Sequence, residues 1–254
     1  SSSLNINVFN GRYATALPFY FIAKEANNVD FYALEIWGRK SPHVAKNRLI
    51  HDPQYIFNNA IQSYKALNLI ESKKIAKEYF DQRWEEGGKS TGEKTFIDKQ
   101  KVEDKSLFIG NKALKISIFP SSNFEYNFLP YGYDPVAQDE ELENFISHFV
   151  SHGHSVEIII RLHPNLSISP IVEYSAFRSL SHMSNEHVLV RTIDPQSSMS
   201  TYQLIKESDF VVSFASFTAV EANYLRKKVV QIGPSRYRYF DISNQFENGI
   251  QAAE

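Results

Sequence analysis

The sequence predicts an α/β protein in which helices cover parallel sheets. Short apolar runs rich in β-branched residues alternate with segments of helical periodicity along most of the chain. The clearest case is Ser208–Tyr237, where an apolar strand, a turn of small residues, a helix and a second apolar strand follow one another. Polar residues come directly after the apolar runs, which is where ligands bind in open α/β sheets. Since a β-α-β connection makes its two strands parallel, we predict two Rossmann-like domains with parallel sheets.

Composition limits the classes of function that the chain can serve. Its 254 residues are 43% hydrophobic, which is enough to build a full core. A net charge of −2 argues against broad nucleic-acid binding, and the lack of cysteine excludes disulfide and thiolate chemistry. The longest apolar runs have about five residues, far fewer than a membrane span needs, and no signal peptide is visible. We therefore expect a soluble, cytoplasmic protein.

The N-terminal part begins with a strand–helix–strand pattern. Leu4–Phe9 alternates as a strand does, Tyr13–Ala26 has helical periodicity, and Val29–Ile36 is a second strand. Pro53–Phe80 is helical in pattern and is expected to form one or two helices. The pattern starts abruptly, without earlier strands to complete a sheet, so we expect part of the N-terminal domain to be absent from this chain.

A charged segment separates the two halves of the chain. Gln82–Ser106 contains glycines and many charges, which is typical of a linker or a mobile loop. We therefore predict an N-terminal domain over residues 1–106 and a C-terminal domain over residues 107–254.

The C-terminal part is more regular. Strands are expected at Lys115–Pro120, Val156–Leu162, His187–Ile193, Phe210–Phe214 and Val229–Ile232. Helices are expected at Glu140–His152, Ile171–Met183 and Ser200–Glu207, and again after Phe217, with a long aromatic loop at residues 127–139. Five strands separated by four helices predict a doubly wound, five-stranded parallel sheet between Lys112 and Ile232.

Polar residues gather where these strands end. They are Ser121, Ser122 and Glu125 after the first strand, Arg161 and His163 at the second, Ser213 and Ser216 after the fourth, and Tyr237 after the fifth. Loops are polar in most proteins, so the clustering has an ordinary explanation too. The common sheet edge nevertheless favours a ligand crevice.

His163 and Arg161 belong to the segment RLHPN. The proline that follows His163 favours an extended conformation, which would project the imidazole from the strand end. An imidazole in that position can donate to a phosphate or act as an acid, although a lone histidine is more often structural. Arg161 lies two residues earlier, so we expect both side chains on the same face.

Two interpretations of Glu221 stay open. Thr218 and Glu221 have the spacing of a capping box, in which the carboxylate satisfies a backbone N–H. The carboxylate could instead accept the two ribose hydroxyls of a nucleotide. Ser213 and Ser216 have a similar ambiguity, because capping a helix and helping to hold a phosphate require the same geometry.

Four segments share a pattern with one family: FNGR at 9–12, FPSSNFE at 119–125, IIRLHPN at 159–165 and SDFVVSFASFTAVEANYLRKKVVQIGPSRY at 208–237. Together they resemble bacterial capsule and surface-polysaccharide glycosyltransferases of the GT-B fold, including the capsule-type β-Kdo transferases. This resemblance implies two facing Rossmann-like domains with an active site between them, and transfer of a sugar from a nucleotide-activated donor such as CMP-Kdo or a UDP-sugar.

The resemblance also implies roles for individual residues. Catalytic roles fall to His163, Glu125 and Glu35. Substrate or nucleotide binding falls to Asn10, Arg12, Ser121, Ser122, Arg161, Ser213, Ser216, Glu221 and Tyr237. The C-terminal residues would hold the nucleotide, whereas Asn10, Arg12 and Glu35 would face the acceptor or the sugar. No metal and no cofactor is expected, because GT-B enzymes generally need no bound metal and the nucleotide-sugar is a substrate.

The implied partners are the donor and a glycan or glycolipid acceptor on the way to a capsule or lipopolysaccharide. A peripheral position at the inner membrane face, or in a polysaccharide-synthase complex, is compatible with this interpretation. Two departures from the family are apparent: the N-terminal domain looks incomplete, and the chain stops soon after Tyr237 without closing helices. If both are real, the chain alone could lack activity.

Related activities use a similar His-Pro and Ser/Glu pattern. A glycerol-phosphate transferase, a nucleotide-sugar epimerase and a non-catalytic sugar-binding module of a polysaccharide synthase therefore remain as alternatives. Product analysis with candidate donors separates the enzymes, and nucleotide binding without turnover would favour the module.

Overall fold

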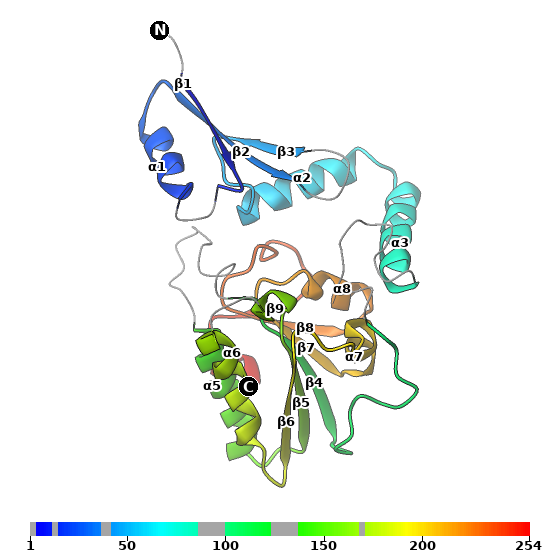
Figure 1. Cartoon of the computed structure of the whole chain (residues 1–254). Coiled ribbons are helices and arrows are strands. Elements are labelled where there is room, and N and C mark those ends of the chain that lie inside the picture. Colours follow the sequence, from blue (N-terminus) through cyan, green and yellow to red (C-terminus); the bar gives the residue numbers. More distant parts are fainter. Residues whose placement is uncertain (1–3, 12–14, 37–41, 86–99, 123–136, 168–170) are drawn as a thin grey trace. The chain divides into compact units, whose positions relative to one another are not determined.

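The computed structural model describes residues 4–11, 15–36, 42–85, 100–122, 137–167 and 171–254. The chain divides into two compact units (Figure 1). The described residues of the first unit are 4–11, 15–36 and 42–85, and those of the second are 100–122, 137–167 and 171–254. The predicted boundary between residues 106 and 107 stays a prediction, but the described residues from 100 onward belong to the second unit.

The first unit has the predicted strand–helix–strand start. β1 (Leu4–Phe9) and β2 (Val29–Ile36) are parallel neighbours, and α1 (Leu17–Glu25) connects them. A third strand, β3 (Pro42–Lys46), pairs antiparallel with β2, so the predicted parallel sheet is correct for β1 and β2 only. β3 escaped prediction because its sequence, PHVAK, is short, polar and begins with proline, as edge strands often are.

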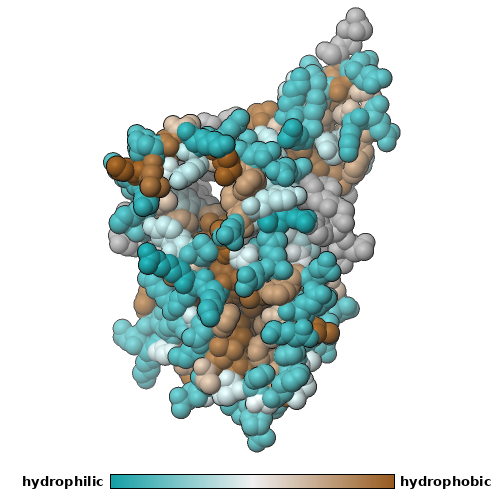
Figure 2. All heavy atoms as spheres, turned by 180° about the vertical axis from the view of Figure 1, so that it is seen from behind, coloured by the Kyte–Doolittle hydropathy of each residue, from teal (hydrophilic) through white to brown (hydrophobic). Residues whose placement is uncertain are grey.

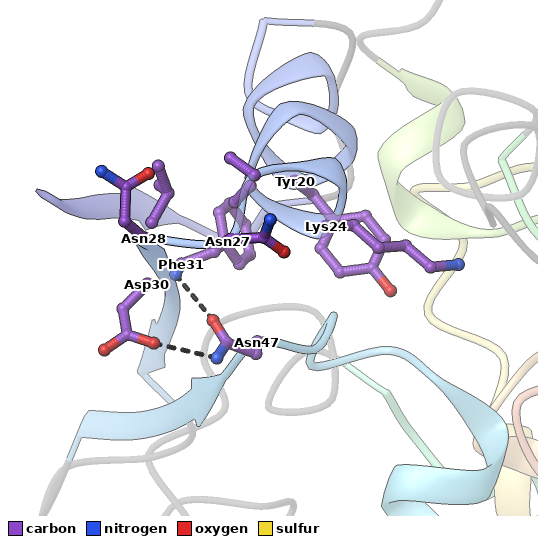
Figure 3. Close-up of a pocket in the computed structure, with 10 residues that line it drawn as sticks. Tyr20, Lys24, Asn27, Asn28, Asp30, Phe31 and Asn47 are labelled. Atoms are coloured by element: carbon purple, nitrogen blue, oxygen red, sulfur yellow. Dashed lines mark hydrogen bonds between the residues drawn. The ribbon is translucent and has the colours of Figure 1, made fainter. Parts of the chain in front are cut away.

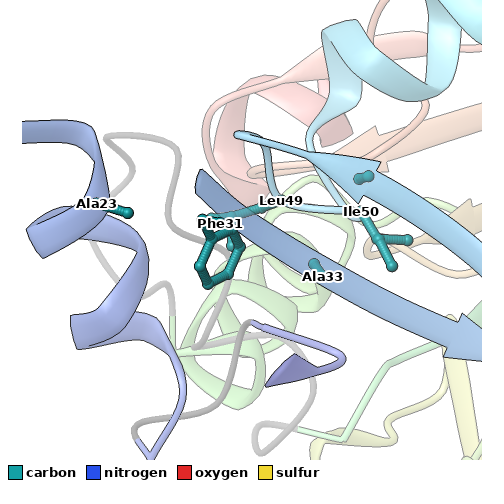
Figure 4. Packing of buried hydrophobic residues seen from close by; sticks show 6 residues of the cluster. Ala23, Phe31, Ala33, Leu49 and Ile50 are labelled. Atoms are coloured by element: carbon teal, nitrogen blue, oxygen red, sulfur yellow. The ribbon is translucent and has the colours of Figure 1, made fainter. Parts of the chain in front are cut away.

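The core of this unit is small and lies between α1, the sheet and the segment after β3. Phe31 and Ile50 are completely buried, and Leu49 is nearly so (Figure 4). The ring of Tyr20 meets Phe31 edge-on, with centroids 5.4 Å apart. The short segment after β3 therefore belongs to the core and is held firmly.

Two helices follow, which is one of the two possibilities predicted for Pro53–Phe80. α2 (Pro53–Lys65) starts at Asp52, whose carboxylate accepts from the backbone N–H groups of Gln54 and Tyr55. α3 (Leu69–Glu85) continues past Gln82, so the first four residues of the predicted linker are helical. Several apolar side chains of these helices are exposed, Ile70 most of all at 81%.

Figure 2 shows a mainly hydrophilic surface on the face seen from behind, with apolar residues scattered over it. In the part of the chain that the structure describes, no helix is both long enough and apolar enough to cross a membrane.

The second unit contains the predicted parallel sheet. Its strands are β4 (Leu114–Phe119), β5 (Val156–Arg161), β6 (Val188–Ile193), β7 (Phe210–Ser213), β8 (Lys228–Ile232) and β9 (Asn244–Phe246). All neighbours are parallel, and the order is β6-β5-β4-β7-β8-β9. The α/β class and the five predicted strands are confirmed. β9 was missed because three mostly polar residues at a sheet edge have no hydrophobic period.

Helices cover both faces of this sheet. They are α5 (Gln138–Ser151), α6 (Ile171–Ser179), α7 (Thr201–Glu207), α8 (Thr218–Tyr224) and α9 (Gly249–Ala253). Figure 1 shows α5 and α6 on one side of the sheet and α7 and α8 on the other. The Ser200 side chain caps α7 by accepting from Gln203 N–H. The short α9 packs on α5, so the segment after Tyr237 does include a helix against this unit.

Residues 100–106 are tied to the second unit by hydrogen bonds, although their charge suggested a linker. The Gln100 side chain accepts from Thr201 N–H, and the backbone N–H of Lys101 donates to Ser198. The Gln203 side-chain amide accepts from the backbone N–H of Glu103 and donates to the backbone carbonyl of the same residue. The composition of the segment is that of a linker, but its partners about 100 residues later keep it in place.

Gly249 gives a direct test of the packing between α5 and α9. A Cβ atom built at this position would lie 1.9 Å from the backbone oxygen of Glu141, which cannot move without disturbing α5. We expect Gly249→Ala to lower the free energy of unfolding by about 2 kcal/mol or more, as overpacking does.

Urea unfolding followed by circular dichroism measures this change. Ile250→Ala is the matched control, because its side chain on the same helix is half exposed and should cost much less. Equal stability of the Gly249→Ala variant and the wild type would show that α9 does not pack on α5 this closely.

Candidate functional site

The strand order of the second unit reverses direction between β4 and β7. From β4 the chain adds β5 and β6 on one side, and from β7 it adds β8 and β9 on the other. Connections on the two sides pass over opposite faces, so the loops that leave the carboxyl ends of β4 and β7 diverge. Ligands of open α/β sheets bind at such a switch point.

The loop after β4 is fastened to the turn after β7. The hydroxyl of Ser121 donates to the backbone oxygen of Phe214 at 3.0 Å. The Gln138 side chain accepts from the N–H of Ser121 and donates to its carbonyl, at 2.9 and 3.0 Å. Ser121, Ser122 and Gln138 are all buried. The two predicted serines therefore lie at the switch point, and Gln138 supports them although sequence reasoning placed it in a loop.

The turn after β7 is tight and made of small residues. Ser213 is completely buried, and Ala215 has φ of 28°, in the left-handed region that residues with a side chain rarely adopt. The Ser216 hydroxyl accepts from Thr218 N–H at 3.3 Å and donates to the Thr218 hydroxyl at 3.1 Å. Ser216 thus satisfies one backbone N–H at the start of α8. The unusual φ of Ala215 is a local strain of the kind found in turns that serve a function.

Glu221 has a partner that the sequence did not suggest. The N-cap of α8 is Phe217, so Thr218 lies inside the helix and the predicted capping box is wrong. The carboxylate instead accepts from the hydroxyl of Tyr202 at 2.7 Å, and Glu221 is 4% exposed. The Tyr202 hydroxyl therefore orients the Glu221 carboxylate. Binding of ribose hydroxyls by Glu221 stays a prediction.

Arg161 and His163 differ in their surroundings at the end of β5. The Arg161 guanidinium donates to the backbone oxygens of Asp194 and Ser197, the latter at 2.9 Å. Burial lowers the pKa of Arg161 to about 10, and the nearby charge of Asp194 opposes this shift. Arg161 therefore remains charged at neutral pH and holds the loop after β6, which is a positioning role.

His163 follows as a half-buried residue, and its carbonyl accepts from Leu166 N–H. Pro164 starts a single 3-10 turn, Pro164–Ser167, which ends the extended backbone immediately after the imidazole. The expected position of His163, beyond the end of β5, is the one observed.

Polar residues also surround the end of β8. The buried Gln231 amide donates to the Ser235 hydroxyl at 2.8 Å and accepts from Ser243 at 2.7 Å. The Tyr237 N–H donates to the same Ser235 hydroxyl, and its ring meets Phe217 edge-on at 6.1 Å. Tyr237 is therefore tied to the segment that leads into α8, through Phe217. Gln231 and Ser235 were missed because single polar residues beside a strand end have no periodic signal.

A second polar cluster occupies the carboxyl ends of β1 and β2 in the first unit. The Asn10 amide donates to Glu35 Oε2 at 2.6 Å, and His51 Nε2 lies 3.2 Å from the same oxygen. Asn10 and His51 are each 4% exposed. The structure thus brings together the predicted Asn10 and Glu35 and adds His51. The predicted Arg12 and Glu125 lie outside the described residues.

A pocket of about 400 Å³ lies elsewhere in the first unit (Figure 3). It is lined by Tyr20, Ala23, Lys24, Ala26, Asn27, Asn28, Val29, Asp30, Phe31 and Asn47. Asn47 accepts from Phe31 N–H and donates to Asp30, so part of the polar lining is already used internally. The pocket adjoins the amino end of β2, the edge of the sheet opposite to Glu35, which is not where α/β sheets bind ligands.

Metal chemistry has no obvious location within the described ranges. There, no three His, Asp or Glu side chains come together in a way that could hold an ion. The expected independence from metal stays a prediction.

Fold and site together define a Rossmann-like α/β protein with polar residues gathered at the switch point of its larger sheet. No protein-family model and no curated protein sequence matches the chain.

Solved structures do match the chain. The Thermosulfurimonas dismutans KpsC β-Kdo 2,4 transferase has a TM-score of 0.63 at 13% identity, over 97% of this chain and 74% of that one. The β-Kdo 2,7 transferase of the same organism's KpsC has a TM-score of 0.53 at 17% identity, over 97% and 70%. The resemblance to capsule-type β-Kdo transferases is confirmed at the level of the fold.

Proposed function

We propose that the chain is a glycosyltransferase that moves a sugar from a nucleotide-activated donor onto a bacterial surface polysaccharide, with Kdo from CMP-Kdo as the first candidate. The observation that carries the proposal is the joined pair of loops at the switch point, where the Ser121 hydroxyl bonds to Phe214. The fold shared with two KpsC β-Kdo transferases supports the choice of chemistry.

The second unit is proposed to hold the nucleotide. His163 and the Ser213–Ser216 turn would face the phosphate, because they leave the ends of β5 and β7, on either side of β4. Glu221 would accept the ribose hydroxyls, with Tyr202 fixing its orientation. Tyr237 and the buried serines after β4 would shape the crevice, and Arg161 would hold the loop after β6.

The first unit is proposed to serve the acceptor. Asn10 and Glu35 lie together at the strand ends there. The family resemblance adds Arg12 on the acceptor side and gives Glu125, from the other part of the chain, a catalytic role. In the transfer, the bond between the anomeric carbon and the phosphate oxygen breaks, the acceptor oxygen forms a bond to that carbon, and the proton of the acceptor hydroxyl passes to the Glu35 carboxylate. Fixed donors aimed at the departing phosphate stabilise its charge, so no metal is required by this scheme. A peripheral position at the inner membrane face follows from the acceptor and is part of the proposal.

A nucleotide screen tests the function first. A ligand at 100 times its Kd stabilises the folded protein by about 2.7 kcal/mol. If CMP-Kdo is the donor, we therefore expect CMP to raise the melting temperature of the chain more than UDP, GDP or CDP. Mass spectrometry should then detect Kdo added to a glycolipid acceptor when CMP-Kdo is supplied. Stabilisation by another nucleotide would change the donor, and stabilisation by none would contradict the proposal.

His163→Ala is expected to reduce transfer by about 10²- to 10³-fold, as loss of one preorganised donor to developing charge does. The melting temperature should stay close to that of the wild type, because the half-buried side chain lies beyond the end of β5. Steady-state transfer of Kdo measures the effect. His187→Ala, at an exposed histidine of the same unit, is the control. Unchanged turnover, or failure of the variant to fold, would make His163 structural.

Glu221→Gln separates the ribose role from simple support of Tyr202. Glutamine still offers an oxygen to the Tyr202 hydroxyl, so the unliganded melting temperature should change little. Loss of a charged acceptor for ribose should weaken CMP binding by about 1–3 kcal/mol, or roughly 5- to 150-fold.

Titration calorimetry with CMP and 2′-deoxy-CMP decides between the two roles. If Glu221 holds the ribose, the wild type discriminates between these nucleotides and the glutamine variant discriminates much less. Equal discrimination by both proteins would leave Glu221 as the partner of Tyr202 alone.

A further inference from the structure

The cluster of Asn10, Glu35 and His51 has the form of a prepared carboxylate. Glu35 lies near the end of β2, and its Oε2 has both the Asn10 amide at 2.6 Å and His51 Nε2 at 3.2 Å. Asn10 and His51 are buried, whereas the Glu35 side chain is 15% exposed to solvent. An ionised Oε2 can only accept, so with Glu35 ionised this contact requires the tautomer of His51 that carries its proton on Nε2. Among the described residues nothing donates to Oε1.

The backbone fixes both donors in advance. Asn10 has φ of 65° and Gly11 has φ of 81°, so the chain turns sharply as soon as β1 ends. The Asn10 N–H donates to Leu34 at 2.7 Å, which keeps this turn beside Glu35. A Cβ on Gly11 would lie 3.2 Å from Ala33 and 3.3 Å from Leu49, so the close approach favours glycine.

His51 is equally constrained. It follows the core residues Leu49 and Ile50 and precedes Asp52, the cap of α2. The segment that carries the His51 imidazole is therefore fixed on both sides, by the core before it and by the start of α2 after it. His43 is the cross-strand neighbour of Glu35 in β3, but its ring bonds to Tyr55 of α2 at 3.2 Å. Two histidines thus adjoin the carboxylate, and one of them bonds to it.

The chemistry of this arrangement favours reaction at one oxygen. Two contacts on Oε2 set the plane of the carboxylate. A carboxylate that takes the proton of an acceptor hydroxyl must be held in such a fixed orientation.

An independent feature points to a ligand at the same place. Asn10 Oδ1 is buried and has no hydrogen-bond partner among the described residues. A buried amide oxygen normally has a donor, and a sugar hydroxyl supplies one.

We propose that Asn10 and His51 are positioning residues that orient Glu35 for reaction with the acceptor sugar, and that Asn10 Oδ1 accepts a hydroxyl of that sugar. This proposal rests on the glycosyltransferase function above and extends it to His51, which no motif identifies. Glu35 is the catalytic residue in this scheme, and His51 acts only through it.

Two variants of His51 separate positioning from packing. His51→Leu removes the donor, whereas the amide nitrogen of His51→Gln can still donate to Glu35. We expect His51→Leu to lower kcat for Kdo transfer from CMP-Kdo by about 10²-fold, as a misplaced catalytic group does, with CMP affinity within twofold of the wild type. His51→Gln should recover at least tenfold of that loss. His43→Leu is the matched control and should retain activity within about threefold.

A spectroscopic measurement checks the contact without a transfer assay. Nitrogen-15 NMR should show a slowly exchanging Nε2 proton on His51, and Glu35→Gln should shift it. Failure of the proposed function appears as a wild type that binds no nucleotide and transfers no sugar. Failure of this inference appears as a wild type that transfers sugar and a His51→Leu variant that does so within threefold. Equal losses of kcat and of melting temperature in the Leu and Gln variants would also overturn it, by making His51 structural.

Discussion

The reversal of strand order between β4 and β7 is the constraint on which the larger unit depends. Connections to the two sides cross opposite faces of the sheet, so the loops after β4 and β7 separate and leave backbone groups to be satisfied. The Ser121 hydroxyl closes this gap by bonding to Phe214, and the Gln138 amide satisfies both backbone groups of Ser121. Ser121 and Gln138 are both buried, so their hydrogen bonds replace contacts with water and hold the two loops together. The residues that join the loops are therefore the same ones that the proposed function places beside the ligand.

The sequence predicts the buried parts of this fold well and the edges poorly. β5 is buried along all six residues, so its apolar run could hardly be mistaken. β3 and β9 are edge strands with polar sequences, and neither has a hydrophobic period that could reveal it. The linker prediction for residues 100–106 failed for a different reason. Their charges indicate a linker, but Gln203 and Glu207 hold them through bonds across about 100 residues, which no local pattern reports.

For the candidate site, the sequence locates residues but cannot assign their partners. The strand ends correctly place His163, Ser121 and Ser213 at one edge of the sheet. Arg161 is at the same edge, yet its guanidinium is used by two carbonyls of the loop after β6. Glu221 has capping-box spacing, yet the helix begins one residue too early and Tyr202 bonds to the carboxylate instead. Gln138 and His51 carry no signal at all, because a single polar residue acquires its role only from the segment that tertiary packing brings beside it.

Glu35 and Glu221 are carboxylates whose hydrogen-bond donors are brought beside them by packing. Glu35 is fixed by Asn10 and His51, and Glu221 by Tyr202. Removing a carboxylate from water costs free energy that its hydrogen bonds recover only in part. That cost is met when the chain folds, before any ligand arrives. In the proposed function, a sugar or ribose hydroxyl that reaches either carboxylate meets an acceptor that is already oriented and largely desolvated, so less rotational freedom is lost on binding. The donors that stabilise these carboxylates would then contribute to binding even where they touch no ligand.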